Sequence, residues 1–230
     1  MADNSYFGRR SKNNYMFDLS QTPSIANQFI AELRDIEVQG DRMRFRRNLE
    51  RLGEILAYEV SKTLSYQMQP VSTPLGEAEV ALCRQPLVLA TILRAGLPMH
   101  QGMLHYFDRA ESAFVSAYRK HHKDGSFDVH VEYISCPDLT DKTLIICDPM
   151  LATGASMSLA IESLLDNGQP KDIHVVTAIA ATAGVEHMQR VLPEAHLWVG
   201  AVDEELTAKS YIVPGLGDAG DLSYGEKVKE

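Results

Sequence analysis

Short apolar runs alternate with helical patterns along the C-terminal two-thirds of the chain, and no other feature limits the fold so strongly. Most of the runs are rich in branched residues, which suits strands covered on both faces. Helical patterns lie between them at 95–107, 156–168 and 182–192. This alternation predicts an α/β fold with a mostly parallel central sheet and helices on both faces. The predicted strands are LVLATIL (87–93), SAFVSAYR (112–119), DVHVEYI (128–134), TLIICD (143–148), DIHVVTAIAA (172–181) and HLWVGAVD (196–203).

The length and composition fit one large domain. With 230 residues, 45% of them apolar, the chain can bury a substantial core as a single domain spanning 1–230. Residues 1–25 are polar and are predicted to form a loosely held N-terminal arm. At the C-terminal end, residues 204–230 are predicted to form a loop and a tail. No apolar run is long enough to cross a bilayer, and the start of the chain lacks a signal-peptide core. We therefore expect a cytoplasmic protein without membrane contacts.

Charge and cysteine content narrow the partners further. The formal net charge of −9 argues against non-specific nucleic-acid binding. Cys83, Cys136 and Cys147 are far apart and odd in number, so neither a disulfide framework nor a zinc site is predicted.

Two helices are predicted before the first buried strand, at 25–33 and 41–64. The second is amphipathic, with apolar residues recurring at helical spacing. These residues are Phe45, Leu49, Leu52, Leu56 and Val60. The basic residues between them are predicted to form the solvated face of the helix, and the alternative is a basic surface for RNA. They are Arg42, Arg46 and Arg47.

The segment TLIICDPMLATGAS (143–156) has the pattern of a phosphate-binding loop. A buried strand ends at Asp148, a turn contains Thr153, Gly154 and Ser156, and a helix follows. A helix start presents unpaired N–H groups at the positive end of the macrodipole, and small residues let a phosphate approach them. The alternative is that Ser156 only caps the helix. No lysine follows Gly154, so the segment is not a P-loop.

Two arginines close other apolar strands. Arg94 ends LVLATILR, and Arg119 ends SAFVSAYR ahead of a polar loop, KHHKDGSFD, with a hairpin expected near its Asp-Gly pair. An arginine at a strand end is placed to bind a polyanion through two parallel hydrogen bonds. Together with the loop at 152–156, they predict a site for one monophosphate and one diphosphate.

The segment YIVPGLGDAGD (211–221) contains a literal G-x-G-x-x-G. It lies at the end of the chain and not in the first turn of a βαβ unit, so dinucleotide binding is not predicted. Residues without a Cβ let backbone N–H and C=O groups approach a flat ligand closely. The segment is therefore interpreted as a shaped loop for a planar ligand, with a flexible tail as the alternative.

ILRAG, DPMLATGAS and YIVPGLGDAGD together resemble the uracil phosphoribosyltransferases, which are type I phosphoribosyltransferases. The resemblance runs from about Ile30 through LRD, FRRNLERLGEILAYE and STPLG to the C-terminus. It implies the type I fold with a small hood and an N-terminal helical arm. It also implies an enzyme that makes UMP and pyrophosphate from uracil and phosphoribosyl pyrophosphate (PRPP), with Mg²⁺ bound mainly through PRPP and no direct protein ligand. A homodimer or higher homo-oligomer is implied, and no nucleic-acid partner.

The resemblance also assigns site residues. The implied catalytic residues are Asp218, Arg94 and Arg119, and the implied uracil contacts are Ile212, Gly217, Asp218 and Ala219. The implied PRPP contacts are Arg94, Arg119, Asp148, Pro149, Met150, Leu151, Ala152, Thr153, Gly154, Ala155, Ser156 and Asp218. An alternative function is a catalytically weak regulator of the same fold that senses pyrimidine nucleotides and binds RNA.

The sequence departs from the family pattern in three places. Ala155 stands where the family usually has a second glycine. The segment after Arg119 is longer and more basic than in the family. ATAGVEH (181–187) replaces a segment that is rich in Pro and Glu in the family.

Overall fold

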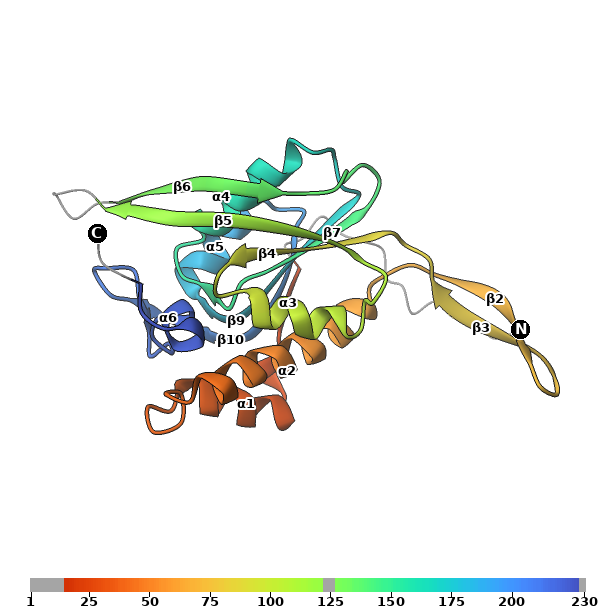
Figure 1. The fold of residues 1–230 in the computed structure, drawn as a ribbon, viewed down its shortest axis with the longest axis horizontal. Helices are drawn as coiled ribbons and strands as arrows, with labels where there is room; N and C mark the ends of the chain where they lie inside the picture. Colours follow the sequence, from red (N-terminus) through yellow and green to blue (C-terminus); the bar gives the residue numbers. More distant parts are fainter. Residues whose placement is uncertain (1–14, 122–126, 228–230) are drawn as a thin grey trace.

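The computed structural model of the chain describes residues 15–121 and 127–227, and its centre is a mostly parallel sheet (Figure 1). The strand order is β1-β10-β9-β7-β4-β5-β6, and the short β8 pairs with β9. Every neighbouring pair is parallel except β5 and β6, which confirms the predicted sheet. The strands are β1 (Met16–Asp18), β4 (Leu87–Leu93), β5 (Glu111–His121), β6 (Phe127–Ser135), β7 (Thr143–Cys147), β8 (Met150–Leu151), β9 (Asp172–Ala181) and β10 (His196–Asp203).

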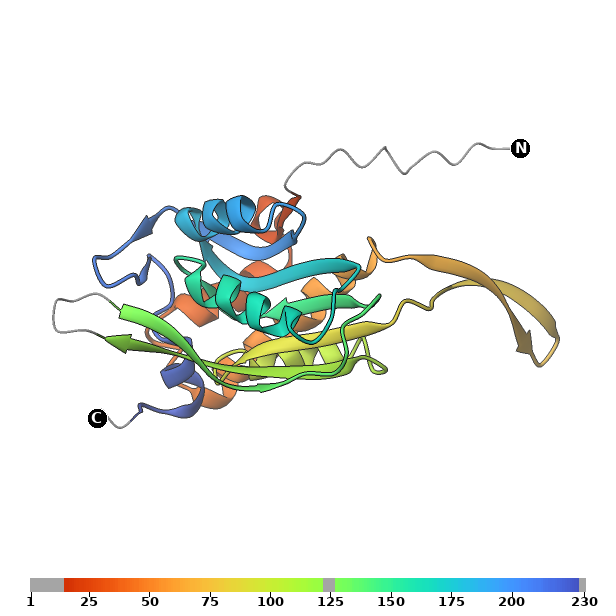
Figure 2. The ribbon, with the colours of Figure 1, turned by 90° about the horizontal axis from the view of Figure 1, so that it is seen from above.

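Helices cover both faces of this sheet, as predicted (Figure 2). On one face lie α1 (Ile25–Arg34), α2 (Arg42–Ser61) and α3 (Leu97–Leu104), and on the other lie α4 (Ala155–Leu165) and α5 (Thr182–Val191). The start of α1 is fixed by a capping box between Ser24 and Asn27, and that of α2 by the Asp41 carboxylate. No helix in the described part of the chain has the length and apolar character to span a membrane.

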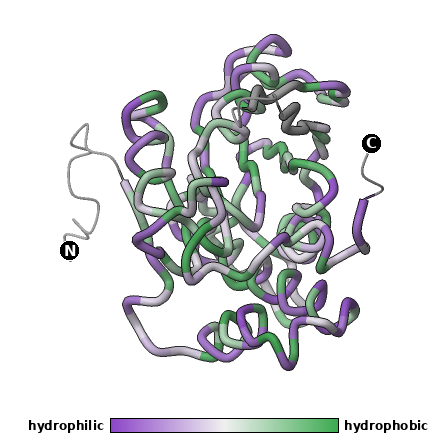
Figure 3. The backbone as a smooth tube through the Cα atoms, turned by 90° about the vertical axis from the view of Figure 1, so that its left-hand side faces the viewer, coloured by the Kyte–Doolittle hydropathy of each residue, from purple (hydrophilic) through white to green (hydrophobic). Residues whose placement is uncertain are grey.

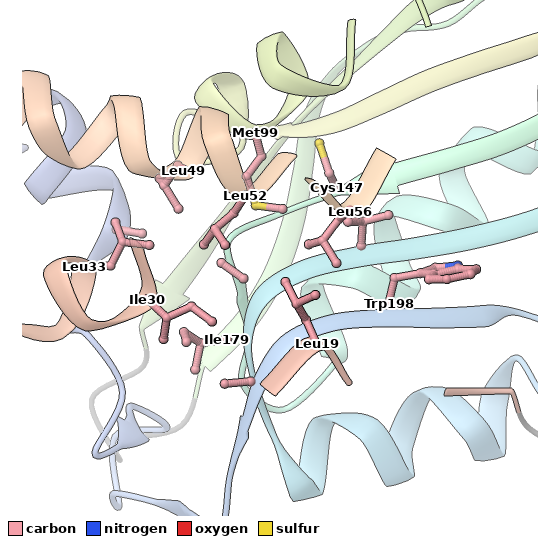
Figure 4. Packing of buried hydrophobic residues seen from close by; sticks show 14 of the residues in the cluster. Leu19, Ile30, Leu33, Leu49, Leu52, Leu56, Met99, Cys147, Ile179 and Trp198 are labelled. Carbon is pink, nitrogen blue, oxygen red and sulfur yellow. The ribbon is translucent and has the colours of Figure 1, made fainter. Parts of the chain in front are cut away.

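The largest buried cluster lies between the sheet and the helices α1, α2 and α3 (Figure 4). Leu49, Leu52 and Leu56 of α2 point at the strands, and the ring of Trp198 on β10 is 1% exposed. Figure 3 shows the consequence along the backbone, because central strands are mainly hydrophobic while helices alternate between hydrophobic and hydrophilic residues. The amphipathic pattern of 41–64 thus correctly predicted which side of α2 is buried.

The N-terminal segment from residue 15 is not the loosely held arm that the sequence predicted. Met16–Asp18 forms the edge strand β1, parallel to β10, and a 3₁₀ turn, Leu19–Gln21, follows. The ring of Phe17 lies 5.5 Å from that of Trp198, and Leu19 is buried. Apolar contacts with β10 therefore order this short stretch, which contains Met16, Phe17 and Leu19 within an otherwise polar arm. Residues 1–14 lie outside the described part of the chain.

A hairpin of β2 (Tyr66–Thr73) and β3 (Gly76–Cys83) was not predicted. Its strands pair only with each other, and the hairpin projects away from the body of the molecule in both ribbon views (Figures 1 and 2). The predicted hairpin after Arg119 is present as β5 and β6, with longer strands than expected, while its connection at 122–126 lies outside the described residues.

A small hood lies beyond the sheet, close to α1 and α2. It consists of the two-stranded pair β11 (Glu205–Leu206) and β12 (Ile212–Val213) and the short helix α6 (Ala219–Tyr224). Its buried residues Ile212, Leu216 and Ala219 join the cluster that α1, α2 and α3 form with the sheet. The position of the hood is thus set by the N-terminal helices.

Candidate active site

The loops that follow β4 and β7 meet at the carboxyl edge of the sheet. Thr91 pairs with Cys147, so these strands end side by side, and the Thr91 hydroxyl donates to the Cys147 carbonyl at 3.1 Å. The loop after β4 turns tightly, with Gly96 N donating to Ile92 O at 3.0 Å. A Cβ on Gly96 would lie 3.0 Å from the Cys147 oxygen and would collide with Thr91 Oγ1. Glycine is therefore required where the loops after β4 and β7 touch.

The predicted phosphate loop is held against β9. Asp148 N donates to Val176 O at 3.1 Å, and Ile179 N donates to Pro149 O at 2.9 Å. Met150 and Leu151 then pair with β9 as β8. These bonds fix the loop on its sheet side before it bends through 152–154 into α4.

Helix α4 begins two residues earlier than the capping alternative requires. Gly154, with φ of 81°, occupies the cap position and supplies no side chain, while Ser156 lies inside the first turn. The alternative that Ser156 caps the helix is therefore wrong. The first helical hydrogen bond runs from Ser158 N to Gly154 O at 2.9 Å, so earlier N–H groups have no partner within the helix. One of them, Ala155 N, has a weak contact with Thr153 Oγ1 at 3.4 Å.

Helix α5 supports the phosphate loop from the side opposite β9. A Cβ on Gly184 would lie 2.6 Å from Ala152 O, and a Cβ on Gly154 would lie 2.7 Å from the His187 ring. The Ser158 hydroxyl donates to Ala155 O at 3.1 Å and also contacts His187 Nε2 at 3.2 Å. Gly184 and His187 belong to the segment 181–187, whose consequence the sequence did not reveal.

Arg94 follows β4 after a cis peptide bond and faces the hood. Its Nη2 atom donates to Gly225 O at 3.2 Å and lies 3.4 Å from Asp221 Oδ1. Its Nε atom is buried and has no partner within the described residues. The side chain is 38% exposed, so the guanidinium joins the loop after β4 to α6 and still reaches solvent.

Arg119 lies on β5 beyond the same edge of the sheet. The last residue of β5 that pairs with β4 is Ser116, opposite Leu93, and the register shifts directly after it. Arg119 follows in the part of β5 that pairs only with β6, opposite Val129. The backbone of Arg119 therefore extends past the strand end that precedes Arg94, and the role of its side chain stays a prediction.

The segment 211–221 is an ordered loop that leads into α6, and the alternative of a flexible tail is wrong. Gly215 and Gly217 have φ angles of 58° and 92°, a region that favours glycine. Asp218 caps α6, since its Oδ1 accepts from Gly220 N at 2.9 Å and from Asp221 N at 3.0 Å. A Cβ on Gly220 would lie 4.0 Å from the Cβ of Ala95, which brings this loop beside the one that carries Arg94.

Of the three arginines predicted to form the solvated face of α2, Arg42 and Arg47 are exposed, as predicted, and Arg46 is half-buried. Arg46 donates to Ser223 O at 2.7 Å and lies over the ring of Tyr224, so it binds the C-terminal segment. Arg47 contacts Glu50 Oε1 at 2.6 Å, and Arg44 forms a bidentate pair with Glu32. The prediction of a solvated face is wrong for Arg46, because α6 packs there, and these internal partners give no support to an RNA surface.

One group of metal-type ligands lies apart from these loops. Among the side chains that the structure describes, ligand atoms of Glu50, Glu54 and His105 lie within 4.8 Å of one another. His105 Nδ1 already contacts Glu54 at 2.9 Å, and Arg47 neutralises Glu50. These contacts describe an ion-pair network between α2 and the end of α3.

Comparison with known proteins agrees over nearly the whole chain. Residues 19–225 match the family model described as uracil phosphoribosyltransferase. A protein of that name from Porphyromonas gingivalis is 56% identical over 206 residues, covering 89% of this chain and 95% of the relative. Another from Pyrococcus furiosus is 37% identical over 217 residues, covering 93% and 91%. The solved structure of the AQ2163 protein from Aquifex aeolicus superposes with a TM-score of 0.83 at 31% identity, covering 93% of this chain and 100% of that one.

Proposed function

The chain belongs to the uracil phosphoribosyltransferase family, which forms UMP and pyrophosphate from uracil and PRPP. We propose that three loops bind these two substrates: the loop after β4, the loop 148–156 and the loop 211–221. The observation that carries the proposal is the contact of Arg94 with Asp221 and Gly225. This contact joins the loop after β4 to the hood, so a diphosphate bound at Arg94 would lie beside a base bound in the hood.

The loop 148–156 takes the 5′-phosphate of PRPP. The start of α4 supports this assignment, because small residues surround N–H groups at the positive end of an eleven-residue helix. The half-buried Asp148 begins this loop directly after β7, and its carboxylate would accept hydrogen bonds from the ribose hydroxyls. Arg94 and Arg119 take the diphosphate, for which a planar guanidinium offers parallel hydrogen bonds.

The loop 211–221 takes uracil through its backbone. The positive φ angles of Gly215 and Gly217 turn N–H and C=O groups in directions that an ordinary strand would not present. No side chain lies within 3.4 Å of the position a Cβ would take on Gly217, so a planar base can approach that residue. Ile212, Gly217 and Ala219 then read the base, and the Asp218 carboxylate orients it.

Catalysis follows from position and charge, without a protein nucleophile. The bond from C1 of the ribose to the pyrophosphate oxygen breaks as pyrophosphate leaves, and C1 develops oxocarbenium character. N1 of uracil then forms the new bond to C1 and loses its proton to the departing pyrophosphate. Holding the two substrates in line removes much of the entropic barrier. Arg94 and Arg119 stabilise the charge that develops on the leaving diphosphate.

Magnesium fits this edge as an ion that arrives with PRPP. Mg²⁺ prefers oxygen ligands and is commonly held by one or two carboxylates together with substrate phosphates. Asp148 directly follows β7 and Asp218 caps α6, and we propose no direct protein ligand for the ion, so PRPP itself supplies the phosphate oxygens that bind it. The ion would neutralise charge on the leaving diphosphate, while the chain's own residues orient the two substrates.

The chain forms a homodimer or higher homo-oligomer through its β2–β3 hairpin. A two-stranded hairpin is marginally stable alone, and this one exposes apolar side chains to solvent. These are Tyr66, Met68, Val71, Leu75 and Val80. A second copy that covers them would stabilise the hairpin.

The free thiols of Cys83, Cys136 and Cys147 support the proposal of a reducing, cytoplasmic location.

An assay of UMP formation tests the function directly. Purified protein, labelled uracil, PRPP and Mg²⁺ should give labelled UMP, and omission of PRPP should abolish it. Absence of UMP, together with a salt-sensitive gel shift on RNA, would favour the regulator over the enzyme.

A further inference from the structure

A buried ion pair lies directly beneath the loop 211–221. Arg34 is the last residue of α1, and Asp203 is the last residue of β10. The two Arg34 Nη atoms donate to the two Asp203 carboxylate oxygens, each at 2.8 Å. The Asp203 side chain is only 6% exposed and that of Arg34 22%, so water competes little for this pair. Planar bidentate pairing fixes both groups in orientation as well as distance.

The pair binds both backbone polar groups of Gly215. Arg34 Nη1 donates to Gly215 O at 2.9 Å, and Asp203 Oδ2 accepts from Gly215 N at 2.9 Å. Gly215 has φ of 58°, and a Cβ there would lie 2.9 Å from the Ile212 carbonyl carbon. The peptide units on both sides of Gly215 are therefore held at one orientation, immediately before Gly217.

The connection between α1 and α2 supports the same loop at a second point. Gln39 Nε2 donates to Leu33 O at 3.2 Å and to Arg34 O at 3.0 Å, which closes the end of α1. Its Oε1 atom lies 4.0 Å from the position that a Cβ on Gly217 would take. The loop thus rests on the C-terminal end of α1 from Gly215 to Gly217.

We propose that Arg34 and Asp203 are positioning residues that set the base specificity of the enzyme. They hold the backbone groups of Gly217 and Ala219 in place before uracil arrives, so binding does not have to order the loop. A buried ion pair contributes little to the free energy of folding, because desolvation of the two charges offsets their attraction. Its fixed geometry, however, suits it to hold the loop 211–221 in one conformation. The inference rests on the proposed role of the loop in binding uracil.

Kinetics of matched variants test the proposal. Arg34→Met removes the pair and the bond to Gly215 O, Arg34→Lys keeps only the charge, and Asp203→Asn keeps an acceptor for Gly215 N. The control is Arg44→Met, because Arg44 forms an equally bidentate pair between α2 and Glu32 of α1, at 2.9 and 2.8 Å. For each variant, kcat, both KM values, the uracil-to-cytosine ratio of kcat/KM and the thermal midpoint are measured.

We expect Arg34→Met to raise KM for uracil by roughly tenfold or more, in keeping with about one or two lost hydrogen bonds, while KM for PRPP changes by less than about twofold. The uracil-to-cytosine ratio should fall, with Arg34→Lys and Asp203→Asn intermediate. Arg44→Met should lower the thermal midpoint and leave both KM values unchanged. If Arg34→Met does not fold, the two milder variants provide the same comparison.

Two results would overturn the proposal. One is a lower thermal midpoint in the Arg34 and Asp203 variants with unchanged KM for uracil, and the other is an equal rise in both KM values. Turnover by the wild-type protein in the same assay distinguishes the two proposals. An inactive wild type would overturn both the proposed function and this inference. An active wild type with unchanged variants would overturn only the inference.

Discussion

The backbone of Gly184 lies so close to Leu151 that a methyl group on Gly184 would be 2.5 Å from the Leu151 carbonyl oxygen. Helix α5 therefore fits directly beneath the proposed phosphate loop, with no room for a side chain at that position. Because Met150 and Leu151 pair with β9, we expect a displacement at Gly184 to shift the residues that follow them, where we place the 5′-phosphate.

Gly184→Ala should weaken PRPP binding. The added methyl group overpacks the contact with Leu151, at a cost of about 1–3 kcal/mol, and shifts the start of α4. We expect a higher KM for PRPP and an unchanged KM for uracil. Gly40→Ala is the matched control, because a Cβ on Gly40 would meet no atom within 4 Å. Equal kinetics in the two variants would show that α5 does not position the loop.

Arg94→Lys should reduce activity although the charge is kept. A single ammonium group cannot hold Gly225 O and also make parallel hydrogen bonds to a diphosphate. We expect kcat/KM for PRPP to fall by roughly tenfold or more, the equivalent of at least one charge-assisted hydrogen bond. Arg109→Lys, at an exposed position between α3 and β5, serves as the control. Full activity of the Arg94 variant would remove Arg94 from the diphosphate site.

The enzyme should strongly prefer uracil to cytosine. Uracil has an acceptor at O4 and a donor at N3, and cytosine inverts both. Backbone groups around Ile212, Gly217 and Ala219 cannot rotate to follow that inversion, so each mismatch leaves a group unpaired at roughly 1–3 kcal/mol. Steady-state kcat/KM with uracil, 5-fluorouracil and cytosine measures the effect, and 5-fluorouracil should be accepted because position 5 makes no hydrogen bond. Comparable turnover of cytosine would contradict reading by the backbone.

His100 should make the folded state sensitive to mild acid. Burial lowers the pKa of this imidazole below its ordinary value, while its contact with Leu89 O opposes that shift. The unfolded chain then binds more protons than the folded one, so stability is present above about pH 6.5 and is lost as pH falls below that value. The thermal midpoint should drop between pH 7.5 and 5.5 by more in the wild type than in His100→Gln. Equal drops would exclude His100 as the cause.

Met68→Asp should shift the protein toward the monomer. Met68 is 59% exposed on β2, and a buried carboxylate would oppose association at that face. Sedimentation velocity should show a smaller species for this variant than for Gln169→Asp, a change at an exposed position outside the hairpin. An identical distribution for both variants would place the subunit interface elsewhere.

The central sheet could be predicted from the sequence because its strands are buried on both faces. DIHVVTAIAA and HLWVGAVD are mainly apolar and rich in branched residues, and β9 and β10 begin and end where these segments do. The β2–β3 hairpin gave no such signal. It faces no core within the chain, so apolar and polar residues mix along Tyr66–Thr73 without a buried side to order them.

The contacts that orient the site could not be predicted, because they join residues far apart in the sequence. Arg34 meets Asp203 across 169 positions, and Arg94 meets Asp221 across 127. Periodicity records which side of an element is buried but not which elements meet at a loop. The role of the segment 181–187 could not be predicted for the same reason. Gly184 indicates a close contact with the phosphate loop only when the structure shows that α5 packs against Leu151 and Ala152.

The two hydrophobic clusters on opposite faces of the sheet support the two substrate loops unequally. The hood residues Ile212, Leu216 and Ala219 pack with α1, α2 and α3, whereas Met157 of α4 and Val185 of α5 belong to the other cluster. The loop 148–156 contributes Ala152 to the first cluster and Leu151 to the second. Changes in the first layer can therefore reshape the pocket for the base while the support of the phosphate loop from the other face is unchanged. A fold built in this way can acquire a new nucleobase by altering one face of its sheet.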